Sequence, residues 1–456
     1  MTSKESAVNA TLSRRWRPSA HLGTRAAAFG GLLCLGTLPV LTAAAPASAA
    51  TTTSFTLSMQ NANVKFSDPL TYDIVTSFEA KYPSIKVVLQ GQPVDQHEAD
   101  MEVAAETHTL PDMFWIQPAY AIPMMKAGDL LNLAPIFKSL GIVDAFPSTS
   151  LQVYTVNGFQ YGMPYQPLVT GFFYNKVLLK KYNVPLPTSL SQLIAAAKLF
   201  NSHGLVTIAQ GADTSDYAIW GWLIALDRFG YQQNYAKLLT GKASWSKTFK
   251  NYYSDLIQLT KAGAFPSNVS TQTYAQALQS FLSSKAVMVD AGAWAVAQIQ
   301  KTSIAHSVGF WWGPTFPNGV GNQHVTMDVP SAPLAVSSAV KSKPAVLSAI
   351  KKFIAFYYSK TGQQLFVKNG QPPVTKYLPP VNPATQPVFA DVIRQMHDSG
   401  WTSALFQPDQ IMEPSVETSF YQSVNGIMEG VYTTPGQAAA VMETAIKQDP
   451  KFLGMG

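Results

Sequence analysis

The chain has 456 residues, of which 13% are charged and 11% are aromatic, and its formal net charge is +6. Residues 1–50 hold five basic residues and one acidic residue, so the rest of the chain carries a net charge of about +2. This balance, without a cluster of lysine and arginine, excludes a typical nucleic-acid-binding protein. Sparse charge and frequent aromatic residues favour a neutral, hydroxyl-rich ligand instead.

The first 50 residues have the order of a secretory signal peptide. Four arginines between positions 14 and 25 precede the apolar run 26–41, and Ala47-Ser48-Ala49 supplies an A-x-A cleavage site. The apolar run is too short to cross a bilayer with room to spare. We therefore expect an exported protein that begins near Ala50 or Thr51. The Arg14-Arg15 pair leaves a twin-arginine export signal open as an alternative to the general route.

The only cysteine, Cys34, lies inside the apolar run. Leu33 precedes it, where a bacterial lipid anchor needs a small residue, so cleavage at the A-x-A site is favoured over lipidation. The mature chain is then free of cysteine, and its stability must come from its core rather than from disulfides. Roughly 400 residues are enough for two or three domains.

The first predicted elements form a βαβ unit. Residues 55–60 alternate as a strand, and Asp68-Pro69 supplies the cap and first position of a helix. The apolar face of that helix repeats at i, i+4 and i+8, in Leu70, Ile74 and Phe78. Tyr82-Pro83 ends the helix, and 85–89 is a second strand. This order implies a parallel sheet, to which a helix over 95–107 and a short strand over 112–115 are added.

The alternation of helices and strands continues through the rest of the chain. The predicted elements are helices opened by Thr188, Tyr274, Lys343-Pro344 and Thr434-Pro435, and a strand over 286–290. Six prolines within 371–388 predict an extended crossing segment rather than a helix. Because no low-complexity linker separates these parts, we expect lobes that share segments of the chain.

Sequence motifs of catalysis are missing. The chain has no G-x-S-x-G, no G-x-G-x-x-G and no G-x-x-x-x-G-K-[ST]. Glu98, Glu102 and Glu106 lie on one face of a predicted helix near His97 and His108, and we interpret that face as solvated rather than as a metal site. We expect no metal and no cofactor. A catalytic carboxylate pair stays open, because the fold sets its spacing.

Aromatic and amide residues at the ends of predicted elements are more informative. Trp115 and Gln117 follow the short strand over 112–115, Trp294 follows the strand over 286–290, and Trp312 lies in the segment GFWWGP. Ligands of open α/β sheets bind beyond the carboxyl ends of the strands. We therefore interpret Trp115 and Trp294 as residues that face a ligand, and Trp222, which opens a helical apolar run, as part of a core.

Five segments in the same order resemble the extracytoplasmic solute-binding proteins of bacterial sugar importers, the maltose-binding-protein type. They are YDIVTSFEAKYPSIKVVL (72–89), LPDMFW followed by AGDLLNLAPIF (110–137), NGFQYGMPYQPLVTGFFYNKVLLKKYNVPLPTSLSQLIAAAKLF (157–200), FLSSKAVMVDAGAWA (281–295) and KPAVLSAIKKFIAFYYSKTGQQLFVKNGQPPV (343–374). The resemblance covers nearly the whole mature chain. One departure is that no lipid-modified cysteine follows the cleavage site, so a Gram-negative periplasm and a Gram-positive surface both stay open.

The resemblance implies an α/β protein with the two-lobed periplasmic-binding-protein fold, in which each lobe is a mostly parallel sheet flanked by helices. Three hinge crossings are expected near 166–170, 325–330 and 371–374. The first lobe would comprise 51–167 and 328–373, and the second lobe 168–327 and 374–456, after a signal peptide over 1–50. The ligand would lie in the cleft and the lobes would close over it.

The resemblance also implies residue roles. Trp115 and Trp294 would stack on sugar rings from opposite lobes, while Asp112 is expected to be structural because an Asp after Pro in a tight turn usually bonds backbone. The other expected ligand-binding residues are Tyr165, Gln166, Asp216, Tyr217, Gln60, Asn61, Gln117 and Trp312.

The function implied is a monomeric receptor without catalysis that captures a carbohydrate and delivers it to the permease subunits of an ABC importer. Two alternatives stay open. One is a secreted polysaccharide-acting enzyme that uses two carboxyls from the set Asp216, Asp290, Asp328 and Glu413. The other keeps the fold but binds a different small solute such as a polyamine, which needs a cleft lined with carboxylates.

Overall fold

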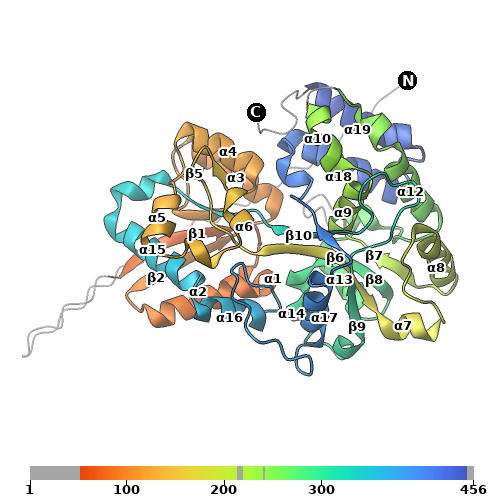
Figure 1. The fold of residues 1–456 in the computed structure, drawn as a ribbon, viewed down its shortest axis with the longest axis horizontal. Helices are drawn as coiled ribbons and strands as arrows, with labels where there is room; N and C mark the ends of the chain where they lie inside the picture. The colour runs from red at the N-terminus through yellow and green to blue at the C-terminus, as the bar shows by residue number, and fades with distance from the viewer. Residues whose placement is uncertain (1–51, 213–218, 240–241, 449–456) are drawn as a thin grey trace, which may run out of the picture. The chain divides into compact units, whose positions relative to one another are not determined.

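The structure, a computed structural model, describes residues 52–212, 219–239 and 242–448, and these form two main β-sheets with helices packed around them (Figure 1). We call the elements around the four-stranded sheet the first lobe, and those around the six-stranded sheet the second lobe. Asp216 and Tyr217, which the sequence analysis selected, lie outside the described residues.

The sheet of the first lobe has the strand order β11-β3-β1-β2. Its strands are β1 (Thr53–Met59), β2 (Ile85–Gly91), β3 (Met113–Trp115) and β11 (Leu334–Val336). β1 runs parallel to both β2 and β3, whereas β11 is antiparallel to β3. The predicted βαβ unit and its parallel pairing are therefore confirmed.

The helices of the first lobe begin and end where the sequence provides caps. Asp68 accepts a hydrogen bond from the Thr71 backbone N–H (3.1 Å), and the helix that follows buries Leu70, Ile74 and Phe78 as expected. The helices are α1 (Val64–Ser67), α2 (Pro69–Lys81), α3 (Val94–Glu106), α4 (Pro118–Ala127), α5 (Ala134–Ser139), α6 (Ser148–Gln152), α15 (Pro344–Tyr357) and α16 (Lys360–Lys368). A short hairpin of β4 (Thr155–Val156) and β5 (Phe159–Gln160) follows α6.

The sheet of the second lobe has the path β12-β10-β6-β8-β7, with β9 paired to β6. Its strands are β6 (Pro167–Asn175), β7 (Val206–Ala209), β8 (Ala286–Gly292), β9 (Val308–Trp311), β10 (Val325–Pro330) and β12 (Thr402–Ser403). β6 is antiparallel to β8, β9 and β10, so this sheet is mixed rather than mostly parallel. The cause is the connectivity: the chain enters the lobe along β6 and leaves it along β10.

The helices of the second lobe cover both faces of its sheet. They are α7 (Lys176–Lys181), α8 (Leu190–Ser202), α9 (Trp220–Arg228), α10 (Tyr231–Leu239), α11 (Trp245–Thr248), α12 (Lys250–Lys261), α13 (Tyr274–Leu282), α14 (Val296–Ile299), α17 (Pro387–Met396), α18 (Pro414–Met428) and α19 (Pro435–Gln448). Helix α8 is capped by Ser189, in a capping box with Gln192, and not by Thr188. Trp222 is fully buried in the core of this lobe, which confirms its expected role.

Two of the connections between the lobes lie side by side. Pro167 pairs with Pro330 and Thr170 with Met327, and the pairing continues into the first lobe through Met163 and Leu334. A third connection, residues 369–386, joins α16 to α17 without helix or strand, as its prolines predict. Figure 1 shows β6 and β10 running together between the two groups of elements. Within the described ranges, no helix has the length and apolar character needed to cross a bilayer.

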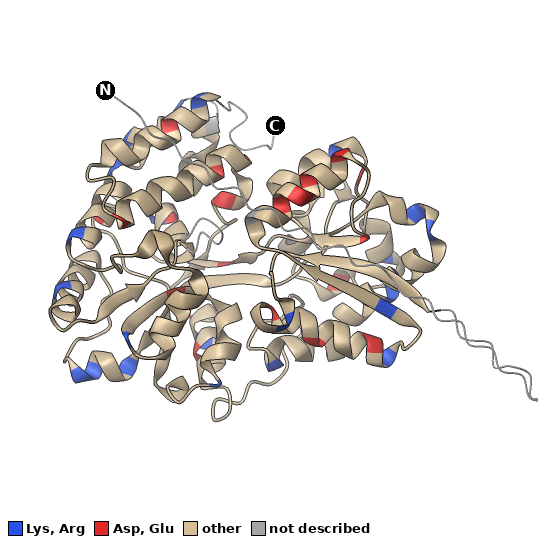
Figure 2. Cartoon of the chain, turned by 180° about the vertical axis from the view of Figure 1, so that it is seen from behind, with Lys and Arg blue, Asp and Glu red and all other residues tan. Residues whose placement is uncertain are grey.

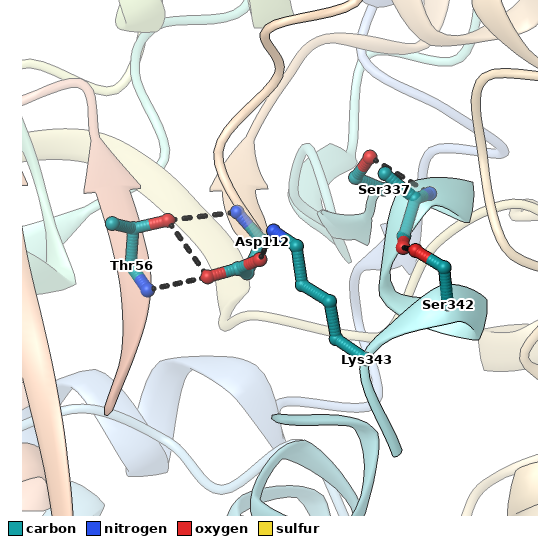
Figure 3. Close-up of polar contacts among 6 residues, drawn as sticks. Thr56, Asp112, Ser337, Ser342 and Lys343 are labelled. Atoms are coloured by element: carbon teal, nitrogen blue, oxygen red, sulfur yellow. Dashed lines mark hydrogen bonds and ion pairs between the residues drawn. The ribbon is translucent and has the colours of Figure 1, made fainter. Parts of the chain in front are cut away.

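Asp112 fixes the start of β3 (Figure 3). Its Oδ2 accepts from the backbone N–H of Thr56 (3.0 Å), one residue before the β1–β3 pairing begins, and its own N–H donates to Thr56 Oγ1 (2.8 Å). Its Oδ1 accepts from Lys343 Nζ (3.0 Å), at the start of α15. Asp112 is structural, as expected, but it bonds a neighbouring strand and not the backbone of its own turn.

Replacing Asp112 should test this role. Asp112→Ala leaves the Thr56 N–H without its acceptor, so we expect the free energy of unfolding to fall by about 1–3 kcal/mol. Lys343→Met is the matched control, because it removes only a half-exposed ion pair worth about 0–1 kcal/mol. Urea unfolding of both variants measures the difference, and equal losses would assign the stabilisation to the ion pair.

Candidate functional site

Three partly exposed aromatic side chains gather in the second lobe. The indole N–H of Trp294 donates to the Tyr274 hydroxyl (2.9 Å), and the Trp294 ring meets the edge of Trp220 at a centroid distance of 4.7 Å. Trp220 also packs edge-on against Tyr274 at 5.1 Å. We call Trp220, Tyr274 and Trp294 the aromatic cluster. Because each ring retains exposed surface and is held by its neighbours, the cluster forms a preorganised apolar face.

The backbone around β8 explains the position of this cluster. A methyl group added at Gly292 would lie 2.2–2.6 Å from three ring carbons of Trp294, so only glycine lets the indole lie this close to the strand end. Gly292 pairs with Thr170, next to the point where β6 leaves the hinge. The aromatic cluster therefore lies at the carboxyl end of β8, close to the connection between the lobes, where the sequence predicted Trp294.

Trp115 is placed differently from its expected role. Its side chain is 5% exposed and packs in the core of the first lobe, with the buried His97 ring at a centroid distance of 6.1 Å. His97 Nε2 bonds the Trp115 carbonyl (2.7 Å), so the imidazole fixes the end of β3. Trp115 offers almost no open face to a ligand here. Gln60 and Asn61, which follow β1, keep partly exposed side chains.

The hinge contains Tyr165 and Gln166. Tyr165 is 1% exposed, and its hydroxyl donates to Asp68, the residue that caps α2. Its side chain therefore stabilises the start of α2 and has almost no surface available to a ligand in this structure. Gln166 borders a cavity of about 240 Å³ that is lined by all three connections between the lobes, including Pro167, Asp328 and Val374. The cavity places Gln166 next to open space, in contrast to Tyr165.

Trp312, another residue expected to bind the ligand, has no exposed surface. It is fully buried in the core of the second lobe, and its ring packs against Phe310. In this structure Trp312 therefore has no accessible surface with which to contact a ligand. The segment GFWWGP continues a strand whose side chains are buried on both faces of the sheet, which explains this burial.

Gln117 links the two lobes. Its Nε2 donates to Glu417 Oε1 (3.2 Å) on α18, and Glu98 on α3 is a hydrogen-bonding neighbour of the same amide. Asp409 lies in the 3-10 turn Asp409–Ile411. The Tyr421 hydroxyl contacts both Asp409 and Glu417 and so connects the two carboxyls. We call Glu98, Asp409 and Glu417 the carboxyl cluster. Figure 2 shows acidic residues gathered along α3.

Burial dominates the electrostatics of this cluster. The exposed fractions of the Glu98, Asp409 and Glu417 side chains are 6%, 2% and 4%. Desolvation raises the pKa of Glu98 to about 8 and the pKa of Asp409 to about 6, and it raises the pKa of Glu417 well above its ordinary value. The expectation of a solvated acidic face on α3 is therefore wrong for Glu98, although Glu102 and Glu106 are exposed.

The carboxyls proposed for an enzyme differ in their surroundings, and Asp216 lies outside the described residues. Asp290 is 1% exposed, its Oδ1 accepts from the Gly221 N–H (2.8 Å), and burial raises its pKa. Asp328 is partly exposed beside the hinge cavity, and burial raises its pKa to about 6. Over the described ranges, no group of three His, Cys, Asp or Glu side chains is arranged to hold a metal ion.

The sequence-based prediction of ligand-binding residues includes Trp294, Gln117 and Gln166, and it does not include Trp220, Tyr274 or the carboxyl cluster. Trp220 lies in the aromatic stretch 211–222, where it was not separated from the buried Trp222. No local signal identifies Glu98 and Glu417, because they are 319 positions apart and meet only through the fold.

Several known proteins are similar to this chain. The "multiple sugar-binding protein" of Streptococcus mutans serotype c (strain ATCC 700610 / UA159) is 23% identical over 346 residues, which are 70% of this chain and 76% of that protein. A solved chitin oligosaccharide binding protein superimposes with a TM-score of 0.76 at 22% identity, covering 88% of this chain and 99% of that one.

A maltose-bound protein of T. maritima superimposes with a TM-score of 0.70 at 19% identity, covering 87% of this chain and 99% of that one. These structural likenesses establish the two-lobed α/β fold. A sequence model described as bacterial extracellular solute-binding protein matches residues 63–364, which is more than half of the chain. The chain therefore belongs to the bacterial extracellular solute-binding protein family.

Proposed function

We propose that this protein captures a carbohydrate between its two lobes and delivers it to the permease subunits of an ABC importer, without catalysis. The aromatic cluster carries the proposal. Sugar rings expose C–H faces that lie against aromatic planes, and the cluster offers such a plane at the carboxyl end of β8. The sugar ligands named for the similar proteins support the same ligand class.

The proposed site joins residues of both lobes. Trp294, with Trp220 and Tyr274, would stack on a ring from the second lobe. Gln60 and Asn61 would donate to hydroxyl groups from the first lobe, and Gln117 and Gln166 would contact the ligand near the hinge. Asp216 and Tyr217 are also proposed to contact the ligand. Only the sequence supports this part of the proposal, because both residues lie outside the described ranges.

The lobe boundaries, the route and the partners are also proposed. The first lobe would comprise 51–167 and 328–373, and the second 168–327 and 374–456, so that hinge motion occurs at the three connections. A signal peptide over 1–50 would direct export to a periplasm or to the outer side of the cell membrane. The protein would act as a monomer whose closed form the permease recognises.

A thermal-shift screen followed by calorimetry tests this function. Chitin oligosaccharides, maltose and raffinose are the first sugars to examine, with spermidine in the same panel. We expect at least one carbohydrate to raise the melting temperature in a concentration-dependent way, and to be recovered unchanged by chromatography. Shortened products would establish an enzyme, and a shift with spermidine alone would establish the polyamine alternative.

A further inference from the structure

The contact between the lobes includes a chain of hydrogen bonds in which one hydroxyl, that of Tyr421, lies between two carboxyl oxygens. Gln117 Nε2 donates to Glu417 Oε1 (3.2 Å), and Glu417 Oε1 lies 2.9 Å from the Tyr421 hydroxyl. The same hydroxyl lies 2.5 Å from Asp409 Oδ2, which also accepts from Gln407 Nε2 (2.6 Å).

The Tyr421 hydroxyl has one proton and cannot donate to two ionised carboxylates along this chain. The Tyr421 hydroxyl lies closer to Asp409 Oδ2 than to Glu417 Oε1, and Asp409 Oδ2 already acts as an acceptor for Gln407. We therefore assign the Tyr421 proton to the hydrogen bond with Asp409. The 2.9 Å contact with Glu417 is then a hydrogen bond only if Glu417 Oε1 carries a proton and donates it to the tyrosine oxygen. As a hydroxyl oxygen, Glu417 Oε1 can still accept from Gln117.

In the part of the chain that the structure describes, these carboxyls have no compensating cation. Among the described residues, no lysine, arginine or histidine lies within ion-pair distance of Glu98, Asp409 or Glu417. Removing several like charges from water without a counter-ion is strongly unfavourable, and protonation is the usual outcome.

The other titratable groups around the cluster add negative charge or are engaged elsewhere. They are Glu102 and Tyr120 on the first-lobe side, and Asp227, Tyr231, Glu413 and Tyr421 on the second-lobe side. His97 bonds the Trp115 carbonyl, and Arg228 donates to the carbonyls of Trp312 and Pro314. Neither cation-forming side chain bonds the carboxyl cluster.

We propose that Glu417 is protonated when the lobes are in contact, so that closure of the lobes takes up a proton and weakens as the pH rises. Proton uptake would regulate the opening and closing of the proposed carbohydrate cleft. The role of this regulation in transport rests on the proposed function, whereas the proton uptake itself does not.

The sign follows from linkage. A carboxyl whose pKa is higher in the closed form than in the open form favours closure at low pH and loses that contribution as the pH rises through the higher value. Glu98 has its pKa raised from 4.5 to about 8 by burial in the contact, and burial raises the pKa of Glu417 in the same direction. Closure should therefore weaken between about pH 5 and pH 8.

Distance measurements without any sugar test this inference. Val103 on α3 and Val431 after α18 are 59% and 60% exposed, so each can be replaced by cysteine and spin-labelled, in the full chain with Cys34→Ser. We expect the ratio of short to long distances to fall by about 10- to 100-fold from pH 5.5 to pH 7.5, since one proton changes the ratio by up to tenfold per pH unit.

Glu417→Gln should keep the lobes closed at both pH values. An amide nitrogen in place of Oε1 has two protons that do not titrate in this range, and it can donate one to Tyr421 and the other to Gln117, whose unpaired Oε1 can turn to accept it. Glu98→Gln is a second variant that should reduce the pH dependence, and Glu106→Gln is the control, since this exposed glutamate lies on the same helix outside the contact. Thermal melts verify that each variant is folded.

A wild-type distance ratio that does not change with pH, or full pH dependence in Glu417→Gln, would overturn the inference. Closure at pH 7.5 induced by spermidine would overturn it as well, because a cation and not a proton would then compensate the carboxyls. A protein that binds no sugar but shows the pH-dependent ratio would contradict the proposed function alone. A protein that binds sugar with a pH-independent ratio would contradict only the role of Glu417.

Discussion

Trp294→Ala should weaken carbohydrate binding by about 30- to 1,000-fold. A tryptophan buries about 150–250 Å² when fully covered, which corresponds to at most about 4–6 kcal/mol. Part of the Trp294 ring is already covered by Trp220 and Gly292, so a loss of about 2–4 kcal/mol is expected on binding. Calorimetry with the sugar found by the screen measures this loss.

The matched control is Trp401→Ala. Trp401 is also a partly exposed tryptophan of the second lobe, but it packs against His324 and Arg228 away from the aromatic cluster. Its replacement should leave the affinity unchanged within about twofold, whereas Trp294→Phe should recover part of the loss because a smaller ring still stacks. If both alanine variants lose affinity equally, a general loosening of the lobe and not stacking explains the result.

Local chemistry explains why much of the fold was predictable from sequence. Asp68 is suited to the N-cap and Pro69 to the first position of a helix, so this pair strongly favours a helix start. The i, i+4 repeat of Leu70 and Ile74 then determines which face of the helix is buried. The same holds for Thr434-Pro435 at the start of α19. The mixed second sheet was not predictable in this way, because the direction of β6 depends on how the chain enters and leaves the lobe.

The candidate site was predictable only in part. The end of a predicted strand shows where along the chain a side chain lies, but it does not show whether other parts of the protein bury that side chain. Trp115 and Trp294 have the same sequence context, an aromatic residue at the end of an apolar strand. The structure buries Trp115 under the first-lobe core and leaves Trp294 partly exposed. The proton on Glu417 depends on Gln117 and Tyr421, which come from different lobes, so no local pattern could reveal it.

Trp115→Ala should lower the free energy of unfolding by about 3–5 kcal/mol, the cost of removing a large buried side chain from a core. The indole is 5% exposed and packs beside His97, whose imidazole bonds the Trp115 carbonyl at 2.7 Å. Removing the ring leaves a cavity beside this imidazole and loosens the end of β3. Trp115→Phe should recover part of the stability, because a smaller ring fills part of the space.

Paired measurements decide between this role and the stacking role that the sequence suggested for Trp115. Urea unfolding without ligand reports the core contribution, and calorimetry reports the ligand contribution. Because Trp115 has almost no accessible surface within the core of the first lobe, we expect most of the loss to appear as stability and the affinity of the folded variant to fall far less than in Trp294→Ala. A variant that unfolds like the wild type but no longer binds sugar would show that Trp115 faces the ligand when the lobes open.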